Sequence, residues 1–197
     1  MIRAGTVSEA VPGSGQWIFV DMGFSERTRS CGLLIGDGNP EETTFATLVA
    51  RLRSLLKNSD KPINLLIEAP LSVAFNQAGN PTGRSIEKRG TQTRYWYVGL
   101  GCSVLVSATY LLRAIADDHH GKTIRLFEGF ISFKDKGIQS SHMRDVFELR
   151  SAIFSPEASS GRVITPDALR KQASDRLTSA FLVSGMDFGI PPVVIVG

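Results

Sequence analysis

Three short, mainly apolar runs in this chain each end in an acidic residue, and this repeated pattern constrains the fold more than any other feature. The runs cover residues 17–20, 63–67 and 124–127, and the acids that follow them are Asp21, Glu68 and Glu128. Such runs are typical of strands buried in a sheet. A carboxylate carried into low dielectric is costly unless a cation or hydrogen bonds compensate it. We therefore predict that the three acids share one sheet edge, where a divalent metal ion would neutralise them; the alternative is that the strands end in water.

A fourth acid, Asp175, lies inside a predicted C-terminal helix that begins at Thr165-Pro166 and covers residues 166–184. The main apolar face of this helix is formed by Leu169, Ala173, Leu177, Ala180 and Phe181. Asp175 lies roughly opposite that face, with small or apolar neighbours in projection. A helix with two packing faces would bring Asp175 over the acid-lined edge; a solvated surface Asp is the alternative.

Hydrophobic periodicity and turn residues predict an alternation of strands and helices after an N-terminal hairpin. Strands are expected at 16–24, 30–35, 63–69, 123–127 and 193–196, and helices at 41–58, 94–116, 142–154 and 166–184. Residues 71–93 form a long irregular stretch, which in compact domains is usually functional. We predict an α/β fold with a mixed sheet and helices on both faces, made by one domain over residues 16–197 after a flexible lead-in over residues 1–15.

Composition narrows the class of protein without identifying it. The chain has 197 residues, of which 42% are apolar and 21% charged, which is typical of a globular domain. No apolar stretch approaches the roughly 20 residues of a membrane span, and the N-terminus has no signal-peptide pattern. We expect a cytoplasmic protein with no membrane association, in which Cys31 and Cys102 stay reduced. The chain also lacks a P-loop and a GxSxG elbow.

Basic residues gather in the long irregular stretch. Arg84, Lys88, Arg89 and Arg94 fall within eleven residues, and Tyr95-Trp96-Tyr97 follows them. Arginine matches phosphate oxygens with a bidentate fork, so this loop is expected to bind phosphates; a solvated loop is the alternative. The three aromatic residues either stack on nucleic-acid bases or belong to the core at a helix start.

The order of these features resembles the ribonuclease H-like fold, and more narrowly the predicted nucleases grouped as domain of unknown function family 429. The matching segments are residues 19–23, 66–72, 126–130 and 174–180. The chain departs from the family pattern in having Glu68 where members more often have Asp. It also has Gly129-Phe130 where a Pro usually follows the third acid.

The resemblance implies a metal-dependent nuclease that hydrolyses phosphodiester bonds of DNA or RNA. Its catalytic residues would be Asp21, Glu68, Glu128 and Asp175. Asp21, Glu68 and Asp175 would hold Mg²⁺ or Mn²⁺, with Glu128 as a possible fourth ligand, and the ion would activate a water molecule. Arg84, Lys88, Arg89 and Arg94 would hold the nucleic-acid strand.

Two other functions stay open at this stage. The same fold would serve as a non-catalytic module that binds nucleic acid or a protein through the basic loop. Asp21-Met22-Gly23-Phe24-Ser25 faintly resembles the first phosphate loop of actin-like and sugar kinases, but 197 residues supply one of the two lobes that such proteins need. The apolar end at residues 193–196 suggests a possible homo-oligomer.

Overall fold

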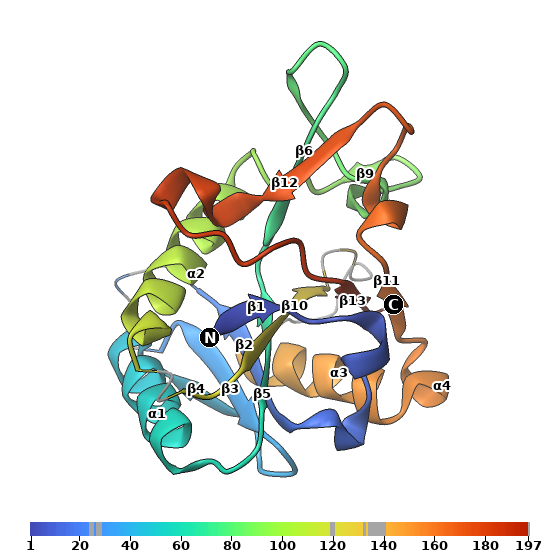
Figure 1. The fold of residues 1–197 in the computed structure, drawn as a ribbon. Helices are drawn as coiled ribbons and strands as arrows, with labels where there is room; N and C mark the ends of the chain where they lie inside the picture. Colours follow the sequence, from blue (N-terminus) through green and yellow to red (C-terminus); the bar gives the residue numbers. More distant parts are fainter. Residues whose placement is uncertain (24–25, 27–28, 119–120, 132, 134–140, 197) are drawn as a thin grey trace.

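An eight-stranded mixed sheet forms the centre of the molecule (Figure 1). The computed structural model describes residues 1–23, 26, 29–118, 121–131, 133 and 141–196. The strands of the sheet are β1 (Ile2–Ala4), β2 (Gln16–Met22), β3 (Cys31–Ile35), β4 (Glu41–Thr43), β5 (Ile63–Glu68), β10 (Ile124–Phe130), β11 (Arg162–Ile164) and β13 (Val193–Ile195). Their order is β11-β13-β10-β5-β2-β3-β4, and β1 pairs with the first half of β10.

Strand directions divide the sheet into a parallel and an antiparallel part. β2, β5, β10 and β13 run parallel to their neighbours in this series. β2, β3 and β4 form an antiparallel meander, and β11 lies antiparallel to β13. The prediction of an α/β fold with a mixed sheet is confirmed.

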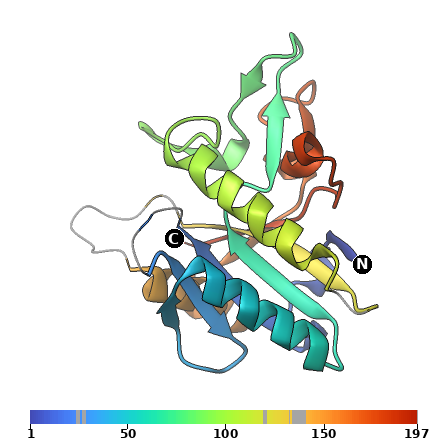
Figure 2. The same cartoon turned by 90° about the vertical axis from the view of Figure 1, so that its left-hand side faces the viewer.

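Helices cover both faces of the sheet, because alternate side chains of each strand point to opposite sides. Ile18 and Val20 pack with α1 (Phe45–Asn58) and α2 (Leu100–Ala116). Trp17 and Phe19 pack instead with α3 (His142–Phe154), which is followed by the short α4 (Pro156–Ser159). Figure 2 shows α1 and α2 side by side on the face toward the viewer, with α3 behind the sheet.

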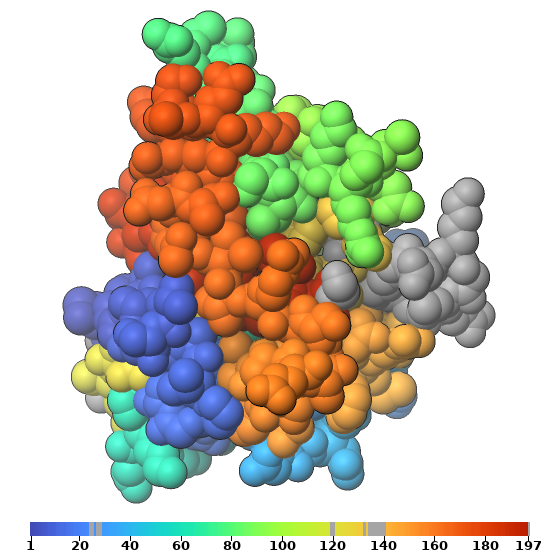
Figure 3. All heavy atoms as spheres, turned by 90° about the vertical axis from the view of Figure 1, so that its right-hand side faces the viewer, coloured from blue at the N-terminus to red at the C-terminus, as the bar shows by residue number. Residues whose placement is uncertain are grey.

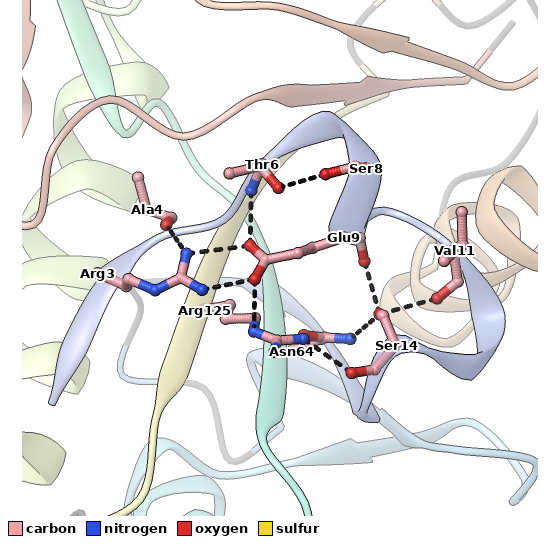
Figure 4. A network of polar contacts seen from close by, with 9 residues as sticks. All are labelled: Arg3, Ala4, Thr6, Ser8, Glu9, Val11, Ser14, Asn64 and Arg125. Carbon is pink, nitrogen blue, oxygen red and sulfur yellow. Dashed lines mark hydrogen bonds and ion pairs between the residues drawn. The ribbon is translucent and has the colours of Figure 1, made fainter.

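Residues 1–15, predicted as a flexible lead-in, form contacts with the central sheet. It contains β1 and two short 3-10 helices, η1 (Val7–Glu9) and η2 (Pro12–Ser14). Glu9 accepts a hydrogen bond from Arg3 at 3.0 Å and forms an ion pair with Arg125 at 3.0 Å (Figure 4). The Asn64 amide donates to the Ser14 hydroxyl at 2.7 Å. These contacts connect the first 15 residues to β5 and β10.

A smaller antiparallel sheet lies beyond the end of β5 (Figure 1). It contains β12 (Arg176–Ser179), β6 (Ser72–Phe75) and β7 (Pro81–Thr82), and the hairpin of β8 (Lys88–Arg89) with β9 (Gln92–Thr93) is nearby in the sequence. The predicted helix over residues 166–184 is therefore wrong. That segment forms η4 (Asp167–Leu169), then β12, then η5 (Ala180–Ser184). Short apolar patterns leave helix and strand ambiguous, and here pairing with β6 decides for a strand.

Two other features bear on the sequence predictions. β13 lies between β10 and β11, so its backbone hydrogen bonds are made within this chain rather than with a second copy. In the part of the chain that the structure describes, none of the helices has the length and apolar character needed to cross a membrane.

Candidate metal centre

Asp21 and Glu68 lie side by side at the ends of two central strands. The parallel register of β2 and β5 pairs Asp21 with Glu68 directly. Both side chains point to the face covered by α3, because they follow the alternation of Phe19 and Leu66. Their placement at one shared sheet edge is confirmed, while a role in catalysis stays a prediction.

Asp145 is the third carboxylate of the cluster. One ligand oxygen from each of Asp21, Glu68 and Asp145 lies within 4.8 Å of the other two. Asp145 sits in the first turn of α3, where the helix dipole favours an anion. Taken as whole residues, Asp21 is 6% exposed and Asp145 is 5% exposed.

Asp145 is not among the acids predicted from the sequence, although its position in the helix carries a signal. Asp145 precedes Leu149 by four residues and Ala152 by seven, so it lies on the apolar face of its helix. Both of those residues are buried against the sheet. An acid on the face that packs toward an acid-lined strand edge was the available clue.

Glu128 lies on the other side of the sheet. The β10–β5 register pairs Glu128 with Ile67, so Gly129 takes the position beside Glu68. Glu128 forms an ion pair with Arg84 at 2.7 Å and accepts a hydrogen bond from the Leu71 amide at 2.8 Å. The predicted fourth ligand is thus wrong in position: its charge is balanced by Arg84, away from the cluster.

Arg84 is likewise not placed to bind phosphate. Its side chain is 1% exposed and also forms an ion pair with Glu87 at 2.7 Å. The Arg84 guanidinium donates to the Ser72 hydroxyl at 2.9 Å. Burial lowers the pKa of Arg84, but its interactions with Glu128 and Glu87 outweigh this effect, and the pKa is raised overall. Burial raises the pKa of Glu87, with Arg84 opposing the shift.

Asp175 does not join the cluster either. It precedes β12, and its carboxylate accepts a hydrogen bond from the backbone N–H of Gln172 at 3.0 Å. The first residue of β12, Arg176, pairs with Phe75 in the small sheet. Among the residues that the structure describes, the grouped ligands are Asp21, Glu68 and Asp145, so the predicted set with Asp175 is corrected at its third member.

His142 contacts the cluster from the first position of α3. Its Nδ1 lies 2.6 Å from the Asp21 Oδ2. The hydrogen bond with Asp21 raises the pKa of His142, burial acts against this, and the charges of Asp21, Glu42 and Asp145 add to the increase.

Gly32 in β3 allows the start of α3 to lie close to the sheet. Gly32 pairs with Asp21 across the β2–β3 hairpin. A Cβ atom at Gly32 would lie 2.4 Å from the backbone oxygen of His142. A larger residue would therefore move the start of α3 away from Asp21.

A hollow of about 480 Å³ lies beside this region. It is lined by residues of β4, the start of α1 and the start of α3, together with residues that precede β3 and β4: Arg29, Pro40, Glu41, Glu42, Thr43, Thr44, Thr47 and Met143. Met143 follows His142 directly, and Glu42 pairs with Gly32 in the sheet. The hollow is therefore close to the first turn of α3, which also carries His142.

The remaining basic residues lie on the surface around the small sheet. Lys88, Arg89 and Arg94 are exposed. The Ser85 hydroxyl donates to the Ala168 carbonyl at 2.6 Å. This bond joins the loop to residues 167–176, a second segment with exposed basic residues at Arg170, Lys171 and Arg176. Figure 3 shows the two segments, green and orange, adjacent on one face.

The three aromatic residues of this loop pack on one another. The rings of Tyr95 and Tyr97 stack with centroids 5.3 Å apart, and Trp96 meets Tyr97 edge-on at 5.5 Å. The Lys171 ammonium lies 4.7 Å from the Tyr95 ring centroid. The Tyr95 ring thus has both Tyr97 and Lys171 as neighbours within the chain.

Comparison with protein-family models, curated proteins and solved structures finds no significant match to this chain. The segment that resembles a kinase phosphate loop, residues 21–25, includes Phe24 and Ser25, which lie outside the described residues, so the structure does not test that resemblance.

The three carboxylates are close enough together that they could hold a metal ion. Magnesium and manganese prefer oxygen ligands and commonly use a few carboxylates together with water. Asp21, Glu68 and Asp145 supply such oxygens from two strands and one helix, so rigid elements position them. A divalent cation there would offset the mutual repulsion of three neighbouring carboxylates.

Proposed function

We propose that this protein is a metal-dependent nuclease with a ribonuclease H-like fold. The observation that carries the proposal is the grouping of Asp21, Glu68 and Asp145 within 4.8 Å. Nucleases use carboxylate-held divalent ions to activate water and to stabilise the leaving oxygen of a phosphodiester.

The arrangement of the elements supports the proposed fold. The sheet reads β4-β3-β2-β5-β10, with a meander followed by two strands parallel to β2. One acid ends the first strand, one ends the adjacent parallel strand, and one lies in the helix after β10. The first two acids are those that the sequence resemblance implies. Asp145, in the helix after β10, stands in place of the implied Asp175, and the implied third-strand acid, Glu128, lies on the other face of the sheet.

The three carboxylates would act together as ligands of one metal site. Asp21, Glu68 and Asp145 would hold Mg²⁺ or Mn²⁺, which when bound supplies Lewis-acid activation of water. The sheet edge and the first turn of α3 keep the three carboxylates oriented before substrate arrives, so little reorganisation is needed.

Nucleic acid would be held by exposed cations on the small sheet and its loops. These are Lys88, Arg89, Arg94, Arg170, Lys171 and Arg176. These six exposed cations are gathered in a chain whose net charge is +3, and one of them, Arg170, pairs with Asp167 at 3.5 Å. An electrostatic contribution of this kind weakens as salt rises.

The test is cleavage of mixed DNA and RNA substrates with Mg²⁺ or Mn²⁺. Asp21→Asn should abolish cleavage, whereas the matched variant Asp175→Asn, outside the cluster, should retain it. Equal activity in wild type and Asp21→Asn would refute the proposal. Metal-induced stabilisation without cleavage of any substrate would support the metal site and reject the nucleic-acid substrate.

The second candidate is a non-catalytic nucleic-acid-binding module, which the exposed cations favour because they lie outside the carboxylate cluster. It predicts binding that persists in EDTA and in Asp21→Asn, with no cleavage. Replacing both Lys88 and Arg89 by Ala should reduce the slope of log K against log salt by about 1 for each lost phosphate contact.

A further inference from the structure

We infer that His142 is a positioning residue that holds the Asp21 carboxylate in the orientation needed to bind a metal ion. The inference rests on the proposed metal centre and adds a residue that lies outside the three carboxylates. The contact between His142 and Asp21 would orient the Asp21 carboxylate before a metal ion binds.

The geometry of the contact is direct. The His142 Nδ1 and the Asp21 Oδ2 are 2.6 Å apart, and the side chains are 34% and 9% exposed. A donated N–H from His142 occupies one oxygen of Asp21 and restricts rotation of the carboxylate. Asp21 then keeps a fixed orientation beside Glu68, its partner in the strand register.

His142 is placed as a supporting residue rather than as a ligand. Ligands of one octahedral ion at about 2.1 Å lie roughly 3 Å apart when adjacent and about 4.2 Å apart when opposite. One oxygen from each of Asp21, Glu68 and Asp145 lies within 4.8 Å of the other two, which is close to these spacings. The ring nitrogens of His142 are not part of that group; the ring reaches the site through Asp21.

The backbone around His142 holds the ring at this place. Ser141 caps α3 by accepting a hydrogen bond from the Arg144 amide at 3.2 Å, which sets where the helix begins. Gly32 leaves room for the His142 carbonyl directly beside Asp21. Asp145 lies in the same helix turn as His142. The first turn of α3 therefore carries both the proposed ligand Asp145 and the residue that would orient Asp21.

Partners that orient metal ligands typically change metal affinity by about 10–100-fold when they are removed. His142→Ala should therefore weaken Mn²⁺ binding by at least about 10-fold. His142→Asn offers an amide N–H near the position of Nδ1 and should restore affinity to within about 3-fold of wild type. Met143→Ala, at the next residue of the same helix turn, should bind as wild type does.

The experiment is calorimetric titration of the EDTA-treated full chain with Mn²⁺, with circular dichroism to confirm that each variant is folded. Unchanged affinity in His142→Ala, or equal loss in folded His142→Ala and His142→Asn, would overturn the inference. Pulsed electron paramagnetic resonance of the Mn²⁺-bound wild type should show no directly coordinated nitrogen; a coordinated nitrogen would make His142 a ligand and also overturn it. Absence of Mn²⁺ binding by wild type would instead reject the metal centre itself, and the inference with it.

Discussion

The carboxylate of Glu128 and the guanidinium of Arg84 form a 2.7 Å ion pair in which both side chains are 1% exposed. Arg84 also forms a 2.7 Å ion pair with Glu87, the last residue of η3 (Ser85–Glu87). One cation therefore balances two buried acids. This group attaches the loop after β7 to the end of β10. Its role in the structure is to join the small sheet to the central one.

Removal of Arg84 should be strongly destabilising, because it leaves two buried carboxylates without their cation. We expect Arg84→Met to lower the free energy of unfolding by about 3–5 kcal/mol, measured by urea denaturation. Arg89→Met, which removes an exposed cation from β8, should change it by less than about 0.5 kcal/mol. Similar values for the two variants would show that the buried pair contributes nothing particular to stability.

The third metal ligand can be identified by comparing two aspartates. Asp145→Asn should abolish the rise in Tm caused by Mn²⁺, because it removes a carboxylate from the cluster. Asp175→Asn should keep that rise, since an Asn side chain still accepts the hydrogen bond from Gln172. Differential scanning fluorimetry with and without Mn²⁺ measures both. The reverse result would restore Asp175 as the ligand.

Gly32 should tolerate no side chain. A Cβ atom there would lie 2.4 Å from the His142 carbonyl oxygen, so Gly32→Ala must displace α3. We expect a loss of about 1–3 kcal/mol in unfolding free energy, as for other overpacked sites, together with weaker Mn²⁺ binding. Gly13→Ala is the control, because a Cβ there meets none of the described atoms within 4 Å. Wild-type stability and affinity in Gly32→Ala would show that the close approach is unimportant.

Glu9 should make stability depend on pH in the acid range. The hydrogen bond from Arg3 lowers the pKa of Glu9 from 4.5 to about 2, burial opposes this, and the Thr6 amide and the charge of Arg125 assist. A lowered carboxylate pKa stabilises the folded state above pH 4.5, and this contribution is lost as the pH falls from there toward 2.

Glu9→Gln should therefore lower the unfolding free energy at pH 7 by about 1–3 kcal/mol, and the difference from wild type should disappear near pH 2. Urea unfolding at several pH values between 7 and 2 measures this convergence. Glu157→Gln, on the exposed α4, should follow wild type throughout. A difference that stays constant down to pH 2 would contradict the proposed ionic role of Glu9.

Local sequence patterns determined the central strands and the third helix. Apolar runs predicted β2, β5 and β10, because strands buried on both faces need apolar residues at consecutive positions. The periodic segment 142–154 matches α3 at both ends. The placement of Asp21 and Glu68 at a shared edge also followed from sequence, since parallel neighbouring strands end on the same side of a sheet.

Tertiary structure alone decided which acids meet. Strand side chains alternate between faces, so the register that pairs Glu128 with Ile67 sends this acid away from Glu68. A shift of one residue would have reversed that outcome, and no local pattern in β10 specifies the register. The pairing of β12 with β6 likewise removed the predicted helix around Asp175. Asp145 reaches the cluster because α3 packs across the sheet. Its place on the apolar face of the helix can be read from the sequence, but its contact with the ends of β2 and β5 cannot.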